Sequence, residues 1–129
     1  MKKIFNHIPF QVKVAVTILY LGVIALLSLL PVKDLPQVPL FPGADKLIHA
    51  GMYFVLSVLS LWTFHTSKVA RWKLYAFVIS WGLFMEILQI LMRSGRQFSM
   101  LDIVANTTGV VLGIALYKVL NAQLKLQQA

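Results

Sequence analysis

Residues 14–30 read VAVTILYLGVIALLSLL, a stretch that carries no charged side chain and is followed at once by Pro31. About 20 mostly apolar residues in a helix are needed to cross the hydrocarbon core of a bilayer. This stretch is longer than the apolar region of a usual secretory signal, and no A-x-A-like cleavage site precedes Pro31. We therefore read it as a retained membrane-spanning helix.

Three further apolar stretches have similar length, at about residues 47–64, 74–92 and 103–120. The composition agrees, because 59% of the residues are hydrophobic and only 12% are charged, about half the charged fraction of a typical soluble domain. The sequence predicts an all-α, polytopic membrane protein of the cell membrane. Its single domain, 1–129, would be a small bundle of four transmembrane helices. With no cysteine, the chain has neither disulfides nor thiolate metal sites.

The net charge of +8 reflects topology rather than nucleic-acid binding, because the basic residues are scattered through short segments. Eight of the twelve would lie on the side of the termini: Lys2, Lys3, Lys13, Lys68, Arg71, Lys73, Lys118 and Lys125. Four would lie on the other side: Lys33, Lys46, Arg93 and Arg96. Since cytoplasmic segments carry the excess of Lys and Arg, we predict that both termini are cytoplasmic. The Pro-rich segment 32–45 would then fold over the outer mouth of the bundle.

Polar residues recur at helical spacing in the last three spans. The second span carries Asp45, His49 and Tyr53 at i, i+4 and i+8, with Lys46 beside them. The third span carries Glu86, Gln89 and Arg93. The fourth span carries Asp102, Asn106, Gly109 and Gly113. Ionisable side chains in a bilayer are costly and need partners or a water-filled site. We therefore expect the three stripes to converge near the outer surface, with Asp45 and Asp102 as N-caps of their helices. The G-x-x-x-G pair would allow close helix packing.

Three segments resemble the VanZ-like membrane proteins: SLLP at 28–31, DKLIHAGMY at 45–53, and EILQ at 86–89 followed by RQFSMLDIVANTTGVVLG at 96–113. The resemblance covers nearly the whole chain and implies a set of motif positions. As ligand-binding residues we predict Asp45, Lys46, His49, Tyr53, Glu86, Gln89, Arg96, Ser99, Asp102 and Asn106. The family takes its name from a protein associated with resistance to the glycopeptide teicoplanin.

Three functions remain open from the sequence. The outward-facing polar residues would bind an amphipathic envelope ligand, such as a lipid-linked cell-wall precursor or a lipophilic glycopeptide, in addition to membrane lipids. Alternatively, His49 or Glu86 would act as a general base in an intramembrane enzyme, or the polar residues would only assemble the bundle. Three carboxylates and His49 could ligate a metal, but neither H-x-x-x-H nor E-x-x-H spacing is present. We therefore predict no metal, no cofactor and no nucleic-acid partner; the oligomeric state is left open.

Overall fold

The computed structural model describes residues 7–31, 41, 43–92 and 97–127. Within these residues the regular structure consists of four long helices and no strand. They are α2 (Phe10–Leu29), α3 (Ala44–Thr63), α4 (Arg71–Leu91) and α5 (Met100–Leu126). Each is long and apolar enough to cross a membrane, with mean hydropathies between 1.3 and 2.3. The predicted fold class, an all-helical protein with four membrane-spanning helices, is confirmed.

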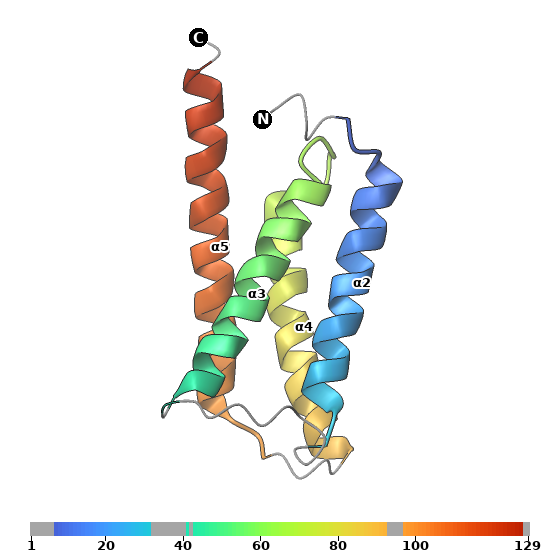
Figure 1. The fold of residues 1–129 in the computed structure, drawn as a ribbon, viewed down its shortest axis with the longest axis vertical. Coiled ribbons are helices and arrows are strands. Elements are labelled where there is room, and N and C mark those ends of the chain that lie inside the picture. The colour runs from blue at the N-terminus through green and yellow to red at the C-terminus, as the bar shows by residue number, and fades with distance from the viewer. Residues whose placement is uncertain (1–6, 32–40, 42, 93–96, 128–129) are drawn as a thin grey trace.

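The helices alternate in direction, so that both chain ends lie at one end of the bundle (Figure 1). We call this end the termini end and the opposite one the far end. Helices α2 and α4 finish at the far end, where α3 and α5 begin. The two inner helices, α3 and α4, each contact the other three, and the most extensive contact joins α3 to α5. Because the helices alternate in direction, α3 and α5 run parallel to each other, and they share a long interface.

The interface between α3 and α5 depends on two glycines. A Cβ atom added to Gly109 would overlap the backbone carbonyl of Ala50, and one added to Gly113 would overlap Ser57 and lie 2.7 Å from the carbonyl oxygen of Phe54. Neither backbone carbonyl can rotate away as a side chain can. The G-x-x-x-G spacing therefore does allow the close backbone approach that the sequence predicts.

Each helix begins three or four residues before its predicted span, because polar first turns continue the helix beyond the apolar stretch. Both predicted N-caps are wrong. Gly43 precedes α3 with a left-handed backbone (φ 86°), which places Asp45 inside the first turn. Ser99 caps α5, and its hydroxyl accepts a hydrogen bond from the backbone N–H of Asp102. The C-terminus of α2 is as expected: the chain turns extended at Leu30 (ψ 137°), since proline disfavours a helical residue before it.

Large apolar side chains cover the outside of the bundle. The most exposed in the spans include Leu19 and Leu91, at 71% and 70%. The buried core is small and is built around Ile24, Tyr53 and Leu56. An apolar exterior around a small core is typical of a protein whose solvent is lipid.

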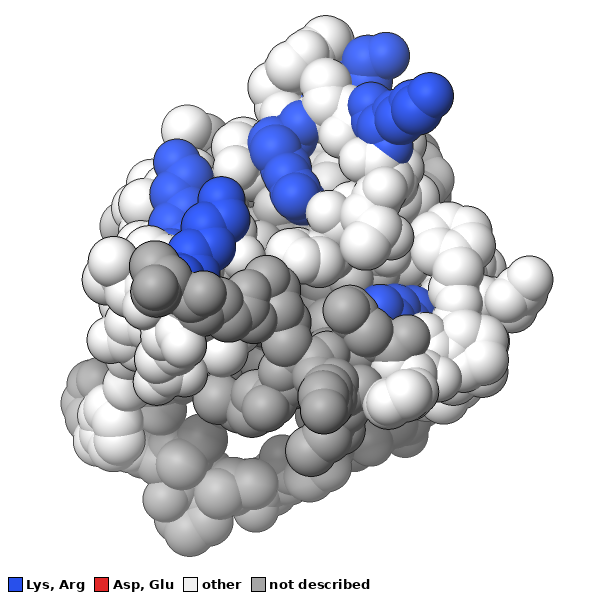
Figure 2. All heavy atoms as spheres, turned by 90° about the horizontal axis from the view of Figure 1, so that it is seen from above, with Lys and Arg blue, Asp and Glu red and all other residues white. Residues whose placement is uncertain are grey.

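Basic side chains gather at the termini end. Figure 2 views the molecule from that end and shows several Lys and Arg side chains and no Asp or Glu among the described residues on this face. The described acidic residues belong to the other half of the bundle: Asp45 and Asp102 lie in the first turns of α3 and α5, and Glu86 lies near the end of α4. The two ends of the bundle therefore differ in charge. Most of the Pro-rich segment expected to cover the outer mouth lies outside the described residues.

Candidate functional site

Five polar side chains from three helices meet at the far end, and we call them the polar cluster: Lys46, His49, Glu86, Asp102 and Asn106. Helix α3 supplies Lys46 and His49 from its first two turns. Helix α5 supplies Asp102 and Asn106 from the same depth, and α4 supplies Glu86 from its last two turns. Lys46 and His49 are spaced i and i+3, and Asp102 and Asn106 are spaced i and i+4, so each pair lies on one face of its helix and parallel α3 and α5 bring the two pairs together.

Lys46 lies between two carboxylates. Its Nζ is 2.8 Å from Oδ2 of Asp45 and forms a second ion pair with Oδ1 of Asp102. The side chains of Asp45, Lys46 and Asp102 are 65%, 32% and 14% exposed, respectively. The first pair is therefore at the surface, whereas the second joins α3 to α5 in a drier position. Ion pairs of the second kind gain more from Coulomb attraction, because water screens them less.

The ring of His49 lies next to two side chains of α5. Its Nδ1 lies 3.0 Å from Oδ1 of Asn106, and its Nε2 lies 3.9 Å from Oδ2 of Asp102. An amide oxygen can only accept, so Nδ1 donates the hydrogen bond. In the neutral ring, Nε2 then carries the lone pair and faces the carboxylate side of the cluster. The hydrogen bond to Asn106 thus orients the imidazole ring.

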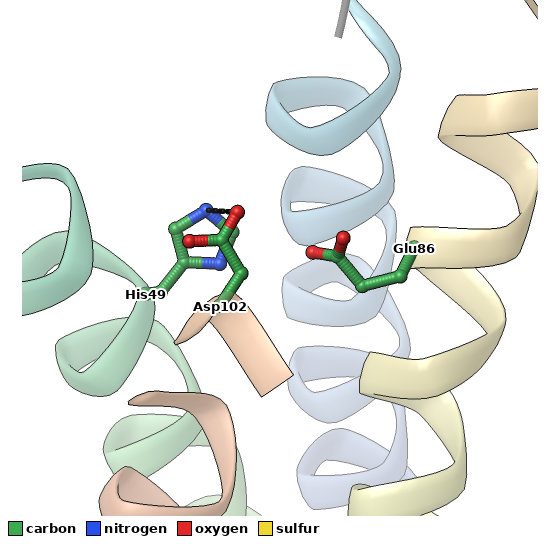
Figure 3. A group of neighbouring side chains, drawn as sticks. All are labelled: His49, Glu86 and Asp102. Carbon is green, nitrogen blue, oxygen red and sulfur yellow. Dashed lines mark ion pairs between the residues drawn. The ribbon is translucent and has the colours of Figure 1, made fainter. Parts of the chain in front are cut away.

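Glu86 is the most deeply buried charged residue of the cluster, with 1% of its surface exposed. Its carboxylate points from α4 toward His49 and Asp102 (Figure 3). A backbone hydrogen bond from Ser99 reaches this carboxylate, but Oε2 has no hydrogen-bond partner among the described residues. One ligand atom from each of His49, Glu86 and Asp102 lies within 4.8 Å of the others. Each of the three predicted stripes therefore contributes one residue to this group.

Other predicted site residues lie beside the cluster or away from it. Gln89 is buried and donates a hydrogen bond of 2.8 Å to the carbonyl of Ser28, at the C-terminus of α2. Tyr53 is buried one turn below His49, in the space that the missing side chain of Gly82 leaves beside Asn106. Ser99 acts as the N-cap of α5. Arg96 lies outside the described residues.

A second group of polar residues, at the termini end, has no counterpart in the sequence predictions. Thr17 and Thr63 join α2 to α3 through a hydrogen bond of 2.8 Å between their hydroxyls, and both are buried. Lys13 is only 7% exposed and lies over the ring of Trp62. The i and i+4 spacing places Lys13 and Thr17 on one face of α2 and is the sequence signal for their contacts with α3. The count of basic residues uses Lys13 only as an indicator of topology.

The described surface also has a shallow groove along α5, unconnected with the charged residues of the cluster. It is lined by Ile103, Val104, Thr107, Thr108, Val111 and Leu112. None of the residues that line the groove belongs to the polar cluster. The outward-facing pocket for a ligand therefore stays a prediction.

Comparison with known proteins is consistent with this architecture. The model of the VanZ/LLP1 family matches residues 2–121, nearly the whole chain. Searches of curated proteins and of solved structures gave no significant match. The matched region includes α2, α3 and α4, most of α5, and every residue of the polar cluster. This multi-pass membrane protein therefore belongs to the VanZ/LLP1 family.

Proposed function

We propose that this protein binds the anionic headgroup of an amphipathic cell-envelope ligand, at a polar cluster that faces the outside of the cell. Membership of the VanZ family supports a membrane protein linked to glycopeptide resistance. The observation that carries the proposal is the convergence of charged side chains from α3, α4 and α5 at one end of an otherwise apolar bundle. Intramembrane ionisable groups indicate function by default, because they cost free energy on insertion.

Charge supports the orientation. The basic side chains seen at the termini end would face the cytoplasm under the positive-inside rule (Figure 2). The polar cluster lies at the opposite end of the same helices, which would therefore face outward. A reporter active only in the cytoplasm should work when fused after Ala129. A fusion there that is active only outside the cell would contradict this orientation.

Lys46 is the residue best placed to meet an incoming anion. Its side chain is one-third exposed and already bridges Asp45 and Asp102, so a phosphate or carboxylate could replace the exposed Asp45 at Nζ. The acyl or prenyl part of the ligand would remain against the apolar helix surface in the lipid. Ligands with both parts include lipid-linked cell-wall precursors and lipophilic glycopeptides.

The test is retention of a defined ligand by the purified full-length protein. Protein in detergent is incubated with a prenyl-pyrophosphate-linked cell-wall precursor or with teicoplanin, and the complex is measured by native mass spectrometry. Lys46→Met should weaken retention about 10- to 100-fold, the amount expected for loss of one charge-assisted hydrogen bond. Lys68→Met is the matched control, because Lys68 is an exposed lysine at the termini end. Equal retention by both variants would contradict the proposal.

A second function, general-base chemistry on a lipid headgroup, is favoured by one observation. The hydrogen bond from Nδ1 of His49 to Asn106 leaves Nε2 as a fixed proton acceptor at the outer side of the cluster. An enzyme would convert the bound precursor into a product of different mass, and His49→Gln would abolish that conversion. An unchanged precursor mass after incubation with the wild-type protein would exclude this reaction for that substrate.

The remaining alternative is that the cluster only holds the helices together. Glu86→Gln keeps the shape of the side chain and removes its charge. Under the proposed function this variant should fold but lose ligand retention. A folded Glu86→Gln protein with wild-type retention would assign Glu86 to architecture alone.

A further inference from the structure

We propose that His49, Glu86 and Asp102 form a binding site for one divalent transition-metal ion, with Zn²⁺ as the reference ion. A ring nitrogen and two carboxylate oxygens, each from a different helix, lie within 4.8 Å of one another (Figure 3). Imidazole and carboxylate together are the donor set of many zinc sites. The site shares residues with the proposed ligand site but holds whether or not an envelope ligand binds there.

The state of Glu86 is the second, independent observation. Its side chain is 99% buried, it points at His49 and Asp102, and its Oε2 has no hydrogen-bond partner among the described residues. A buried carboxylate oxygen without a partner is costly, and native proteins rarely leave one so. A metal ion between the three side chains would supply the missing partner for Oε2.

The neighbours of His49 prepare it as a ligand. When Nδ1–H donates its hydrogen bond to Oδ1 of Asn106, the lone pair of a neutral ring is on Nε2, the nitrogen that faces Asp102. Ligating histidines in metal sites typically donate their other N–H to a carbonyl or carboxylate, which fixes the ring. Asn106 therefore has the role of a positioning residue for the metal site.

Asp102 divides its two oxygens between different partners. Its Oδ1 pairs with Lys46, whereas Oδ2 is directed at Nε2 of His49. Among the described residues, no lysine or arginine is paired with Glu86. Lys46 is itself shared by Asp45 and Asp102, so among the described residues at the far end the three carboxylates of Asp45, Glu86 and Asp102 have one lysine between them. A divalent cation would correct this imbalance.

The dimensions fit an ion after a small adjustment. With metal–ligand distances of about 2.0–2.2 Å, tetrahedral ligand atoms lie about 3.4 Å apart. The observed limit of 4.8 Å is within reach of a small rotation of the Glu86 or Asp102 side chain. Three protein ligands would leave a fourth position for water or for an anionic oxygen.

The test is metal titration of the full-length protein in detergent, after treatment with a chelator. Isothermal titration with Zn²⁺ should show saturable binding of one ion per chain, and Co²⁺ should give the absorption spectrum of a site with nitrogen and oxygen ligands. Glu86→Gln and His49→Gln should each weaken binding more than about 100-fold, and Asn106→Ala about 10- to 100-fold. His7→Gln is the matched control, because His7 is exposed at the termini end, and it should bind like the wild type.

Several results would overturn the site. These are the absence of saturable Zn²⁺ binding by the folded wild type, or equal affinity in the wild type and His49→Gln. If Glu86→Gln does not fold, Asp102→Asn takes its place, and Zn²⁺ should raise the melting temperature of the wild type but not that of the variant. Ligand retention is measured separately in the presence of a chelator. Loss of metal binding with intact retention would thus refute only the metal site.

Discussion

Substitution of Gly109 by alanine should separate α3 from α5 and destabilise the bundle. The added Cβ would overlap the backbone carbonyl of Ala50, which can move only if the whole helix moves. Overpacking in a well-packed interior typically costs about 1–3 kcal/mol, and a backbone obstacle belongs at the upper end of that range. Alanine also gains about 1 kcal/mol over glycine in a helix, so the raw effect understates the steric cost.

Gly51→Ala is the control that removes the propensity term. Gly51 also lies in the middle of a helix, α3, but a Cβ there would meet no atom within 4 Å. The free energies of unfolding of the two variants should therefore differ by about 3 kcal/mol, with Gly109→Ala the less stable. Equilibrium unfolding in mixed micelles, followed by circular dichroism, measures this difference. Equal stabilities would show that α3 and α5 are not in the close contact described above.

Three further substitutions test individual contacts by the same unfolding assay. Lys46→Met should lower the free energy of unfolding by about 1–3 kcal/mol, because Asp102 loses its ion-pair partner. The additional substitution Asp102→Leu should recover part of that stability. No recovery would show that the two residues are not coupled. Gln89→Leu should lower the free energy of unfolding by about 1–3 kcal/mol, because the carbonyl of Ser28 loses its hydrogen-bond donor. Unchanged stability would show that Gln89 does not make this hydrogen bond. Thr63→Val should lower the free energy of unfolding by about 0.6 kcal/mol, the average for interhelical hydrogen bonds in a membrane protein. A loss above the maximum of about 1.7 kcal/mol would indicate a wider role than its bond to Thr17.

Hydropathy predicted the four helices because a long apolar stretch in lipid must satisfy its backbone hydrogen bonds internally, which a helix does. It placed their first residues too late, since the first turns contain charged residues that continue the helix outside the hydrocarbon. The capping errors have a similar origin. Aspartate is a common N-cap residue, which favoured Asp45 and Asp102. However, Gly43 adopts the left-handed backbone that precedes α3. Ser99 lies three residues before Asp102, the spacing at which a cap side chain accepts a hydrogen bond from a backbone N–H.

Helical spacing predicted the convergence of the polar stripes but not the partners of each side chain. His49 and Asn106 meet because both lie on inward faces at the same depth of parallel helices. By contrast, Gln89 bonds to a backbone carbonyl, and a backbone atom leaves no signature in the sequence. The metal-ligand spacings that we searched for describe two ligands on one helix. They cannot detect His49, Glu86 and Asp102, which come from three helices.

The close packing at Gly109 and the geometry of the polar cluster depend on each other. Gly109 lies one turn after Asn106 on α5, and its contact partner Ala50 directly follows His49 on α3. The close approach of the two backbones therefore sets the distance between the histidine ring and the amide that orients it. The same approach brings Lys46 within reach of Asp102 one turn earlier. Gly109, which has no side chain beyond a hydrogen atom, thus controls the geometry of the charged groups. Substitution of Gly109 should therefore disturb the polar cluster, although Gly109 is not one of its members.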